Sequence, residues 1–504
     1  MRILLVNPRY RASFWTWTGA IPITKRPALV PNLALPTLAA LTPKDIEVVI
    51  IDEGVEPLDL DTPCDLVGIT GYVTQRQRMI EIAAAFRDRG VPVAIGGPYA
   101  SLSPATLRPH ADVLFMGEAE LTWPAFLDDF RTGSFKPEYR QDGNIDMRDS
   151  PTPDIGAMHH DRYYSGAVQT SRGCPFECEF CDVIVYLGRR QRHKDPDRIV
   201  EELQNLYGAG YRQVFLADDN FTANRKRAAE TLHAIAAWNA TLPERVTFNT
   251  QVSIDVARDA DLPLLELCIE AGLSTAFVGV ETPNVAALME VKKRQNVIYD
   301  VLSHVHKLQE HGIGVQAGMI VGFDSDTTDV FATQYEFAQA AGTAVTSLTM
   351  LNAPEGTPLE TRLMEQGRLR DDSLDDVFIS TNILPKQMST EELTAGTHWL
   401  MNKLYEPAAF LERLDGLASR LPVKVSPGRP LGREAGLLWD RITQAYGLLG
   451  PEFERMPRQG AELFGRKDFS HLSTALIFYC HVVRLLRYWE VWDPALARAT
   501  EPAW

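Results

Sequence analysis

Three cysteines lie within eight positions of this 504-residue chain, with the spacing Cys-x3-Cys-x2-Cys: Cys174, Cys178 and Cys181. The other three are isolated, which excludes a disulfide framework and predicts small buried hydrophobes: Cys64, Cys268 and Cys480. Zinc normally takes four ligands, and no fourth Cys or His follows at zinc-finger spacing. Three thiolates can instead hold a four-iron cluster and leave one iron open. The spacing predicts such a cluster, with structural zinc or three buried thiols as alternatives.

Short apolar runs alternate with helical patterns around and after the cysteines. The expected strands are Ala167–Ser171, Gln213–Ala217, Val246–Thr250, Thr275–Val280, Gly314–Val321 and Ala344–Met350. Helical periodicity between them covers Asp197–Tyr207, Arg225–Trp238, Leu262–Ala271, Val297–His311 and Thr327–Ala341. Six such units predict an open, partial (β/α)6 barrel with its site at the carboxyl ends of the strands.

The first 120 residues predict a separate doubly wound α/β domain with a parallel sheet. Its expected strands are Arg2–Val6, Glu47–Ile51, Asp65–Thr70, Val91–Ile95 and Asp112–Met116. A ligand of such a sheet binds beyond the carboxyl ends of the strands, here at Thr70–Thr74, at Gly96-Gly97-Pro98 and at Gly117-Glu118.

The chain therefore divides into three expected regions. Residues 1–150 hold the doubly wound domain and a linker, because the stretch 120–165 is rich in proline and poor in periodicity. Residues 151–367 form the barrel. Residues 368–504 are mainly helical, with the clearest helices at Glu391–Leu404 and Leu472–Trp489.

Composition narrows the partners and the location. With 50 Lys and Arg against 66 Asp and Glu, the net charge of −16 argues against nucleic acid. The apolar stretch Leu472–Leu486 is too short to span a membrane, carries His481 and Arg484, and predicts a buried helix. The apolar run Ile3–Val6 is too short for a secretion signal, so we expect a cytoplasmic protein without a transmembrane segment.

At the cysteines the sequence closely resembles the radical S-adenosylmethionine enzymes, whose motif carries an aromatic residue before the last cysteine, here Phe180. The resemblance implies a [4Fe-4S] cluster whose open iron chelates S-adenosylmethionine, which is cleaved to a 5′-deoxyadenosyl radical. The residues that the resemblance assigns to this cofactor are Asp218, Asp219, Gln251, Ser253, the ribose-contacting Glu281 and Gly318 under the adenine. Helix capping, solvated turns and close packing are the alternatives for these positions.

The amino-terminal domain resembles the cobalamin-binding domain of one branch of that superfamily, through Asp65–Thr70, Ile95–Pro98 and Gly117–Glu120. The resemblance implies that cobalamin contacts Thr70, Thr74, Gly96, Gly97, Gly117 and Glu118. Asp52-Glu53-Gly54 stands where other cobalamin proteins carry Asp-x-His-x-x-Gly, so the cobalt is expected to lack a histidine ligand. A domain that has lost its cofactor is the alternative.

Past the barrel, Pro354–Leu359, Met388–Leu393 and Leu404–Pro407 resemble the carboxyl-terminal domain of a subset that includes hopanoid C-2 methylases and a glutamine C-methylase. The resemblance implies a cobalamin-dependent C-methyltransferase acting on an unactivated carbon of a small-molecule, lipid or peptide substrate. A reductant such as flavodoxin or ferredoxin would supply electrons. Alternatives are a radical enzyme that rearranges, cyclises or transfers an aminocarboxypropyl group, and a non-catalytic cobalamin or iron–sulfur sensor.

Overall fold

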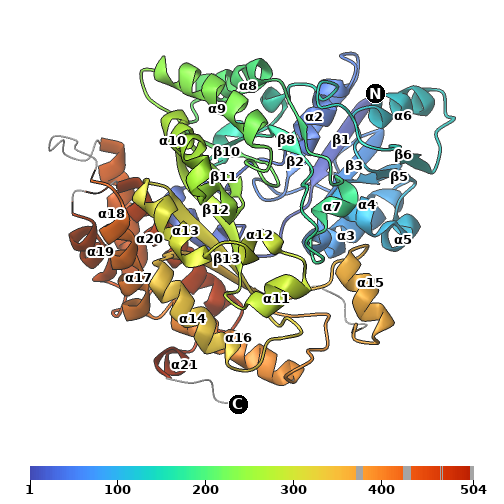
Figure 1. Cartoon of the computed structure of the whole chain (residues 1–504). Helices are drawn as coiled ribbons and strands as arrows, with labels where there is room; N and C mark the ends of the chain where they lie inside the picture. The colour runs from blue at the N-terminus through green and yellow to red at the C-terminus, as the bar shows by residue number, and fades with distance from the viewer. Residues whose placement is uncertain (371–377, 424–432, 466, 468, 500–504) are drawn as a thin grey trace.

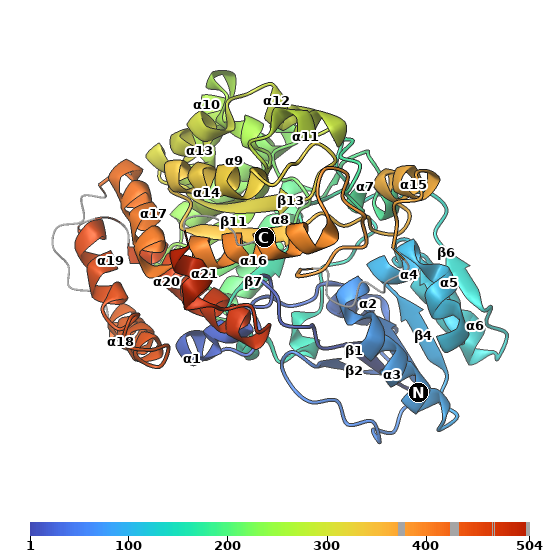
Figure 2. The ribbon, with the colours of Figure 1, turned by 90° about the horizontal axis from the view of Figure 1, so that it is seen from below.

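Two six-stranded parallel sheets dominate the fold, with a layer of helices from the carboxyl-terminal region packed beside the second (Figure 1). The computed structural model describes residues 1–370, 378–423, 433–465, 467 and 469–499. In Figure 2 the first sheet (blue) lies to one side of the barrel strands (green to yellow), and the carboxyl-terminal helices (orange to red) lie to the other.

The first sheet has the strand order β2-β1-β3-β4-β5-β6, which is the doubly wound arrangement expected for residues 1–120 with one extra strand. Its strands are β1 (Arg2–Asn7), β2 (Glu47–Asp52), β3 (Leu66–Thr70), β4 (Val93–Gly96), β5 (Val113–Met116) and β6 (Glu138–Arg140). The helices of this region are α1 (Ile21–Thr24), α2 (Ala34–Leu41), α3 (Arg76–Arg87), α4 (Pro98–Leu102), α5 (Pro104–Leu107) and α6 (Thr122–Arg131). Because helices cover both faces, strands such as β1 are apolar at nearly every position.

The linker predicted to begin at residue 120 is wrong for residues 122–140, which form α6 and β6. Trp123, Phe126 and Leu127 follow helical spacing and are buried against the sheet. The Phe126 ring meets Phe115 of β5 and Tyr139 of β6 at centroid distances of 5.2 and 5.4 Å. These aromatic contacts stabilise α6 and β6 despite the nearby prolines, which had indicated a linker.

The second sheet has the order β14-β13-β12-β11-β10-β7, so its strands follow chain order as in the expected partial barrel. They are β7 (Gly166–Val168), β10 (Gln213–Leu216), β11 (Thr247–Val252), β12 (Leu273–Glu281), β13 (Gly314–Val321) and β14 (Val345–Met350). The helices along this region are α7 (Val183–Tyr186), α8 (Pro196–Gly208), α9 (Arg225–Ala240), α10 (Leu262–Ala271), α11 (Val285–Glu290), α12 (Arg294–Val297), α13 (Val301–Glu310), α14 (Val330–Ala341) and α15 (Pro358–Glu365). A small antiparallel ribbon, β8 (Ser171–Arg172) with β9 (Arg192–His193), brackets the cysteines.

The carboxyl-terminal region is helical, as expected. Its helices are α16 (Thr390–Leu404), α17 (Pro407–Arg420), α18 (Arg433–Gly447), α19 (Met456–Phe464), α20 (Phe469–Tyr488) and α21 (Pro494–Arg498). Among the described helices, α20 alone is long and apolar enough to cross a membrane by length and composition. Its most apolar stretch is 78% buried inside the protein, which agrees with the buried helix predicted there.

Helix α20 holds the loop that follows β1. His481 of α20 is fully buried; its Nε2 lies 2.9 Å from the Ser13 carbonyl, and its Nδ1 accepts a 3.2 Å hydrogen bond from the Gly19 backbone N–H. Phe478, one turn earlier, packs against the rings of Phe14 and Trp17. Because Nδ1 accepts, the ring is neutral, with its proton on Nε2.

Burial lowers the pKa of His481 to about 4, whereas an unfolded histidine titrates near about 6.5. Between these values the unfolded chain binds more protons, so stability falls as the pH falls. We expect wild type to lose about 2 kcal/mol more than His481→Gln between pH 7 and pH 5. Thermal unfolding midpoints of both proteins at the two pH values measure the difference. His233→Gln on the exposed face of α9 is the control, and an equal pH response of all three proteins would contradict the assignment.

Candidate functional site

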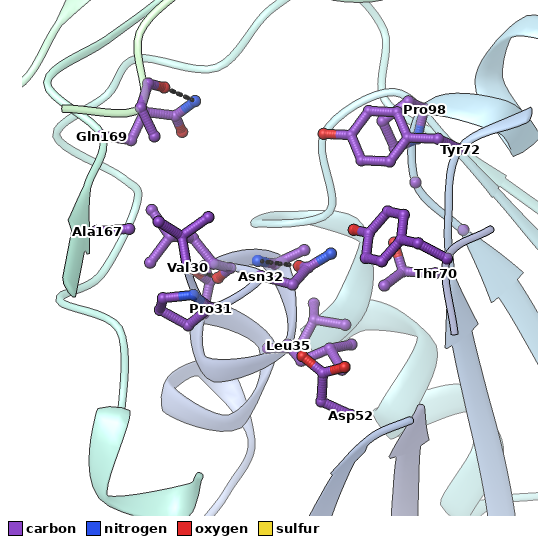
Figure 3. Close-up of a pocket in the computed structure, with 18 of the residues that line it drawn as sticks. Val30, Pro31, Asn32, Leu35, Asp52, Thr70, Tyr72, Pro98, Ala167 and Gln169 are labelled. Atoms are coloured by element: carbon purple, nitrogen blue, oxygen red, sulfur yellow. Dashed lines mark hydrogen bonds between the residues drawn. The ribbon is translucent and has the colours of Figure 1, made fainter. Parts of the chain in front are cut away.

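A cavity of about 1010 Å³ lies between the carboxyl ends of the two sheets. Figure 3 shows Thr70, Tyr72 and Pro98 of the first sheet's loops on one side and Ala167 and Gln169 of the barrel on the other. The volume is at the upper end of the about 300–1,000 Å³ typical of small-molecule pockets. Nine predicted positions line it: Thr70, Thr74, Gly96, Gly97, Gly117, Glu118, Asp218, Asp219 and Gln251.

Close approach of the first sheet's loops explains the glycines at this end of the cavity. Gly97 has φ 91°, and a Cβ there would lie 2.4 Å from Thr70 Oγ1, so no other residue fits. Gly117 likewise has φ 81°. At these two positions the loops therefore present backbone rather than a side chain to the cavity. In the described part of the chain, no histidine lines it.

Glu118 lies on the cavity wall, and its carboxylate holds the two sheets together. It accepts hydrogen bonds from Arg172 at 2.8 Å, from Arg192 at 2.7 Å and from the Ile145 backbone N–H at 3.0 Å. Although burial opposes it, Arg172 also holds the pKa of nearby Glu120 below its usual range. The predicted cobalamin contact of Glu118 stays a prediction, because arginines of the barrel already occupy both of its oxygens.

The three predicted cluster ligands lie on the loop between β8 and β9, with Cys178 buried and Cys174 and Cys181 half-buried. Burial raises the pKa of the Cys174 and Cys181 thiols, and each is raised further by its neighbouring cysteines. Among the described residues, no three His, Cys, Asp or Glu side chains are grouped as ligands of one metal ion. A four-iron cluster asks for a different arrangement, because each thiolate binds a separate iron. Three adjacent thiols on one loop fit that need, since each can bind a separate iron as the thiolate.

Three carboxylates face the cavity beside this loop: Asp182, Asp218 and Asp219. Burial raises the pKa of each, and that of Asp219 reaches about 6. No described residue forms an ion pair with any of them. A cation placed here would relieve their mutual repulsion, and S-adenosylmethionine carries an ammonium and a sulfonium.

The two predicted aspartates differ in what they are free to do. Asp218 accepts four hydrogen bonds, from the backbone N–H and hydroxyl groups of Thr170 and Ser171, and so fixes the start of the cysteine loop. Asp219 accepts a single 3.0 Å hydrogen bond, from the Gly173 N–H, and retains acceptor capacity toward the cavity. The ligand role is therefore better matched by Asp219, and Asp218 is a positioning residue.

The remaining predicted positions lie outside the cavity lining. The Ser253 hydroxyl accepts a 2.5 Å hydrogen bond from Asn220. Glu281 is buried and ion-paired with Lys293, close to the Phe180 ring. Gly318 leaves room for the Phe277 ring, which in turn meets Trp15 at a centroid distance of 4.8 Å. Their cofactor contacts stay predictions.

Several site residues were missed at the sequence level. Asp182 directly follows the last cysteine, and Arg172 precedes the first by two positions, so both positions carried a usable signal. Tyr72 belongs to the predicted ligand loop Thr70–Thr74, although it was not singled out there, and Gln169 lines the cavity without belonging to any motif. Nothing in the spacing of Gln169 indicates that role, because the cavity forms only when the two sheets meet.

Comparison with known proteins places these features in a family. Residues 168–338 match the model of the Radical SAM superfamily, and residues 357–449 match a domain of unknown function (DUF4070). An uncharacterized methyltransferase of Synechocystis sp. is 33% identical over 82% of this chain and 78% of its own length. The hopanoid C-2 methylase of Rhodopseudomonas palustris is 31% identical over 85% of this chain and 82% of its own length.

Two solved structures share the fold. TsrM from Kitasatospora setae, a radical S-adenosylmethionine methyltransferase with cobalamin and a [4Fe-4S] cluster bound, has a TM-score of 0.63 at 16% identity, covering 97% of this chain and 99% of TsrM. The cobalamin-dependent S-adenosylmethionine radical enzyme OxsB has a TM-score of 0.62 at 17% identity, covering 99% of this chain and 81% of OxsB. At these identities the likeness concerns the fold.

Replacing Cys174, Cys178 and Cys181 together with Ala should abolish cluster assembly, because no other thiols of this chain are clustered. Iron and sulfide content and visible absorbance after anaerobic reconstitution measure this. Cys64→Ala, Cys268→Ala and Cys480→Ala are the controls and should reconstitute like wild type. A triple variant that still holds four irons would refute the ligand assignment.

Asp219→Asn and Glu281→Gln should each weaken S-adenosylmethionine binding by about 1–3 kcal/mol, the cost of losing a charged partner in a buried site. Equilibrium dialysis at pH 8, where Asp219 is ionised, measures the affinity. Asp197→Asn, exposed in the first turn of α8, serves as the matched control. Unchanged affinity in either site variant would remove that residue from the binding site.

Proposed function

Because this chain belongs to the cobalamin-binding-domain class of radical S-adenosylmethionine enzymes, of which hopanoid C-2 methylase is a relative, we propose that it methylates an unactivated carbon. One observation carries the proposal: the loops expected to bind cobalamin and the carboxylates beside the cysteines line the same cavity. A methyl donor and a radical source must face one substrate, and a shared cavity meets that need.

When bound, the cluster and S-adenosylmethionine supply a carbon-centred radical, and cobalamin supplies the methyl group. The chain's own residues orient these groups. Asp219 and Asp182 receive the ammonium of S-adenosylmethionine, while Gly97 and Gly117 let backbone approach the corrin. Arg172 and Glu118 keep the two halves at a fixed separation. The enclosed space limits access of water to reactive intermediates.

The cavity also favours a class of substrate. Between the two sheets its wall is largely apolar, with Trp15, Ile21, Leu29, Val30, Leu33 and Phe378 among the lining residues. Such a wall suits a small molecule with a large apolar surface better than a charged peptide. Named substrates of the relatives fit this description: hopanoids, and bacteriochlorophyllide d for a Chlorobaculum tepidum methyltransferase that is 24% identical over 82% of this chain. An electron donor of the flavodoxin or ferredoxin type completes the cytoplasmic system.

Two uses of S-adenosylmethionine leave two different fragments. Reconstituted enzyme given methyl-labelled S-adenosylmethionine and a reductant, with a hopanoid, bacteriochlorophyllide d or an apolar cell extract as substrate, should release S-adenosylhomocysteine and 5′-deoxyadenosine in near-equal amounts. The label should appear on a new carbon–carbon bond of the product. Mass spectrometry and chromatography measure both.

Other reaction types leave other fragments. Methylthioadenosine would indicate aminocarboxypropyl transfer. Deoxyadenosine without S-adenosylhomocysteine, together with an unlabelled product, would indicate a rearrangement or cyclisation. Cyclisation is a named alternative because an anaerobic magnesium-protoporphyrin IX monomethyl ester cyclase of Cereibacter sphaeroides is 28% identical over 57% of this chain. Either pattern would overturn the methylase proposal. The Cys174→Ala protein is the control and should release no deoxyadenosine.

A further inference from the structure

A second segment packs against the cysteine loop: residues 291–295, which run from the end of α11 into the first turn of α12. The backbone N–H of Glu179 donates to the Val291 carbonyl at 3.0 Å, and Lys292 forms a 2.9 Å ion pair with the Glu179 carboxylate. Gln295 Nε2 donates a 3.6 Å hydrogen bond to the Cys178 sulfur. This segment, which no sequence motif marks, therefore packs against the middle of the cysteine loop, at Cys178 and Glu179.

Lys293 is the buried cation of this segment. Its ammonium is ion-paired with Glu281 and lies 5.8 Å from the centre of the Phe180 ring. Phe180 lies between Cys178 and Cys181 in the sequence. Although burial opposes it, Glu281 and then Cys178 raise the pKa of Lys293, so the side chain stays charged. Only 11% of the Lys293 side chain is exposed, whereas 48% of the Lys292 side chain is.

The backbone around this ion pair is shaped to permit it. Glu281 and Lys292 both have positive φ, 63° and 58°, although neither is glycine. A Cβ on Gly279 would lie 2.6 Å from Lys293 Nζ, so a larger residue there would displace the ammonium. Non-glycine residues in this region of φ are strained, and such strain concentrates at functional sites.

We propose that Lys293, assisted by Gln295, raises the reduction potential of the cluster held by the cysteine loop. This inference rests on the proposed function. Reduction adds one negative charge to a cluster already bound by three thiolates. A nearby buried ammonium and a hydrogen bond to a ligand sulfur stabilise the reduced form, since net charge and hydrogen bonds to sulfur set cluster potentials. Lys293 would act on the cluster electrostatically, through space.

Lys293→Met should lower the midpoint potential of the reconstituted cluster. At a fixed applied potential, the ratio of reduced to oxidised cluster should fall about tenfold, which is 59 mV for a one-electron couple. Gln295→Leu should produce a smaller fall in this ratio, and Lys293→Arg, which keeps the positive charge, should retain the wild-type ratio. Potentiometric titration followed by electron paramagnetic resonance, in the full-length protein without S-adenosylmethionine, measures the potential. Iron and sulfide content confirms equal loading.

Lys292→Met is the matched control, because it removes the adjacent, half-exposed ammonium and should change the ratio less than about twofold. If Lys293→Met does not assemble a cluster, Glu281→Gln gives the opposite test: loss of the neutralising carboxylate should raise the potential. If Lys293→Met holds a cluster with the wild-type midpoint potential, or if Lys292→Met shifts the potential as much as Lys293→Met does, the role of Lys293 is refuted while the proposed function stands. A wild-type protein that binds no cluster would overturn the proposed function as well.

Discussion

Glu118, which follows β5 of the first sheet, forms ion pairs with Arg172 and Arg192 of the barrel ribbon. These ion pairs set the geometry on which the site depends. The two arginines are paired directly opposite each other across β8 and β9, and like charges in that position repel. Glu118 accepts from both and removes the repulsion. Because the cysteine loop starts at one arginine and ends at the other, the same carboxylate closes the loop and joins the sheets. Removing one member of a buried pair typically costs about 3–5 kcal/mol.

Buried charge is distributed unevenly around the cavity. On the side of the first sheet, the carboxylates of Glu118 and Glu120 are neutralised by Arg172 and Arg192. Beside the cysteines, Asp182 and Asp219 are half-buried, have pKa values raised by burial, and have no ion partner among the described residues. A fold keeps such groups only where something else compensates them. A cationic cofactor bound at the cluster would supply that compensation, which is the physical reason for proposing that these carboxylates bind S-adenosylmethionine.

The carboxyl-terminal helices help to shape the cavity, although the motif residues of this region do not line it. Helix α20 fixes the loop after β1 through His481 and Phe478, and that loop carries Trp15 against Phe277 of the barrel strand β12. Three distant parts of the chain thus fix the position of Trp15, which lines the cavity.

Periodicity and local spacing were enough to predict most of this protein, because they encode short-range geometry. Strands β1 to β5 and the six barrel strands were predicted within a few residues, and the cysteine motif lies on one loop as its spacing required. Helix α6 and strand β6 were missed because their aromatic contacts span the sheet. Local spacing could not predict whether Glu118 contacts a cofactor or an arginine. It also could not predict that Lys293 lies beside the cysteine loop. A buried charge takes whichever partner the packed sheets bring to it, so the tertiary structure alone decides how these side chains are used.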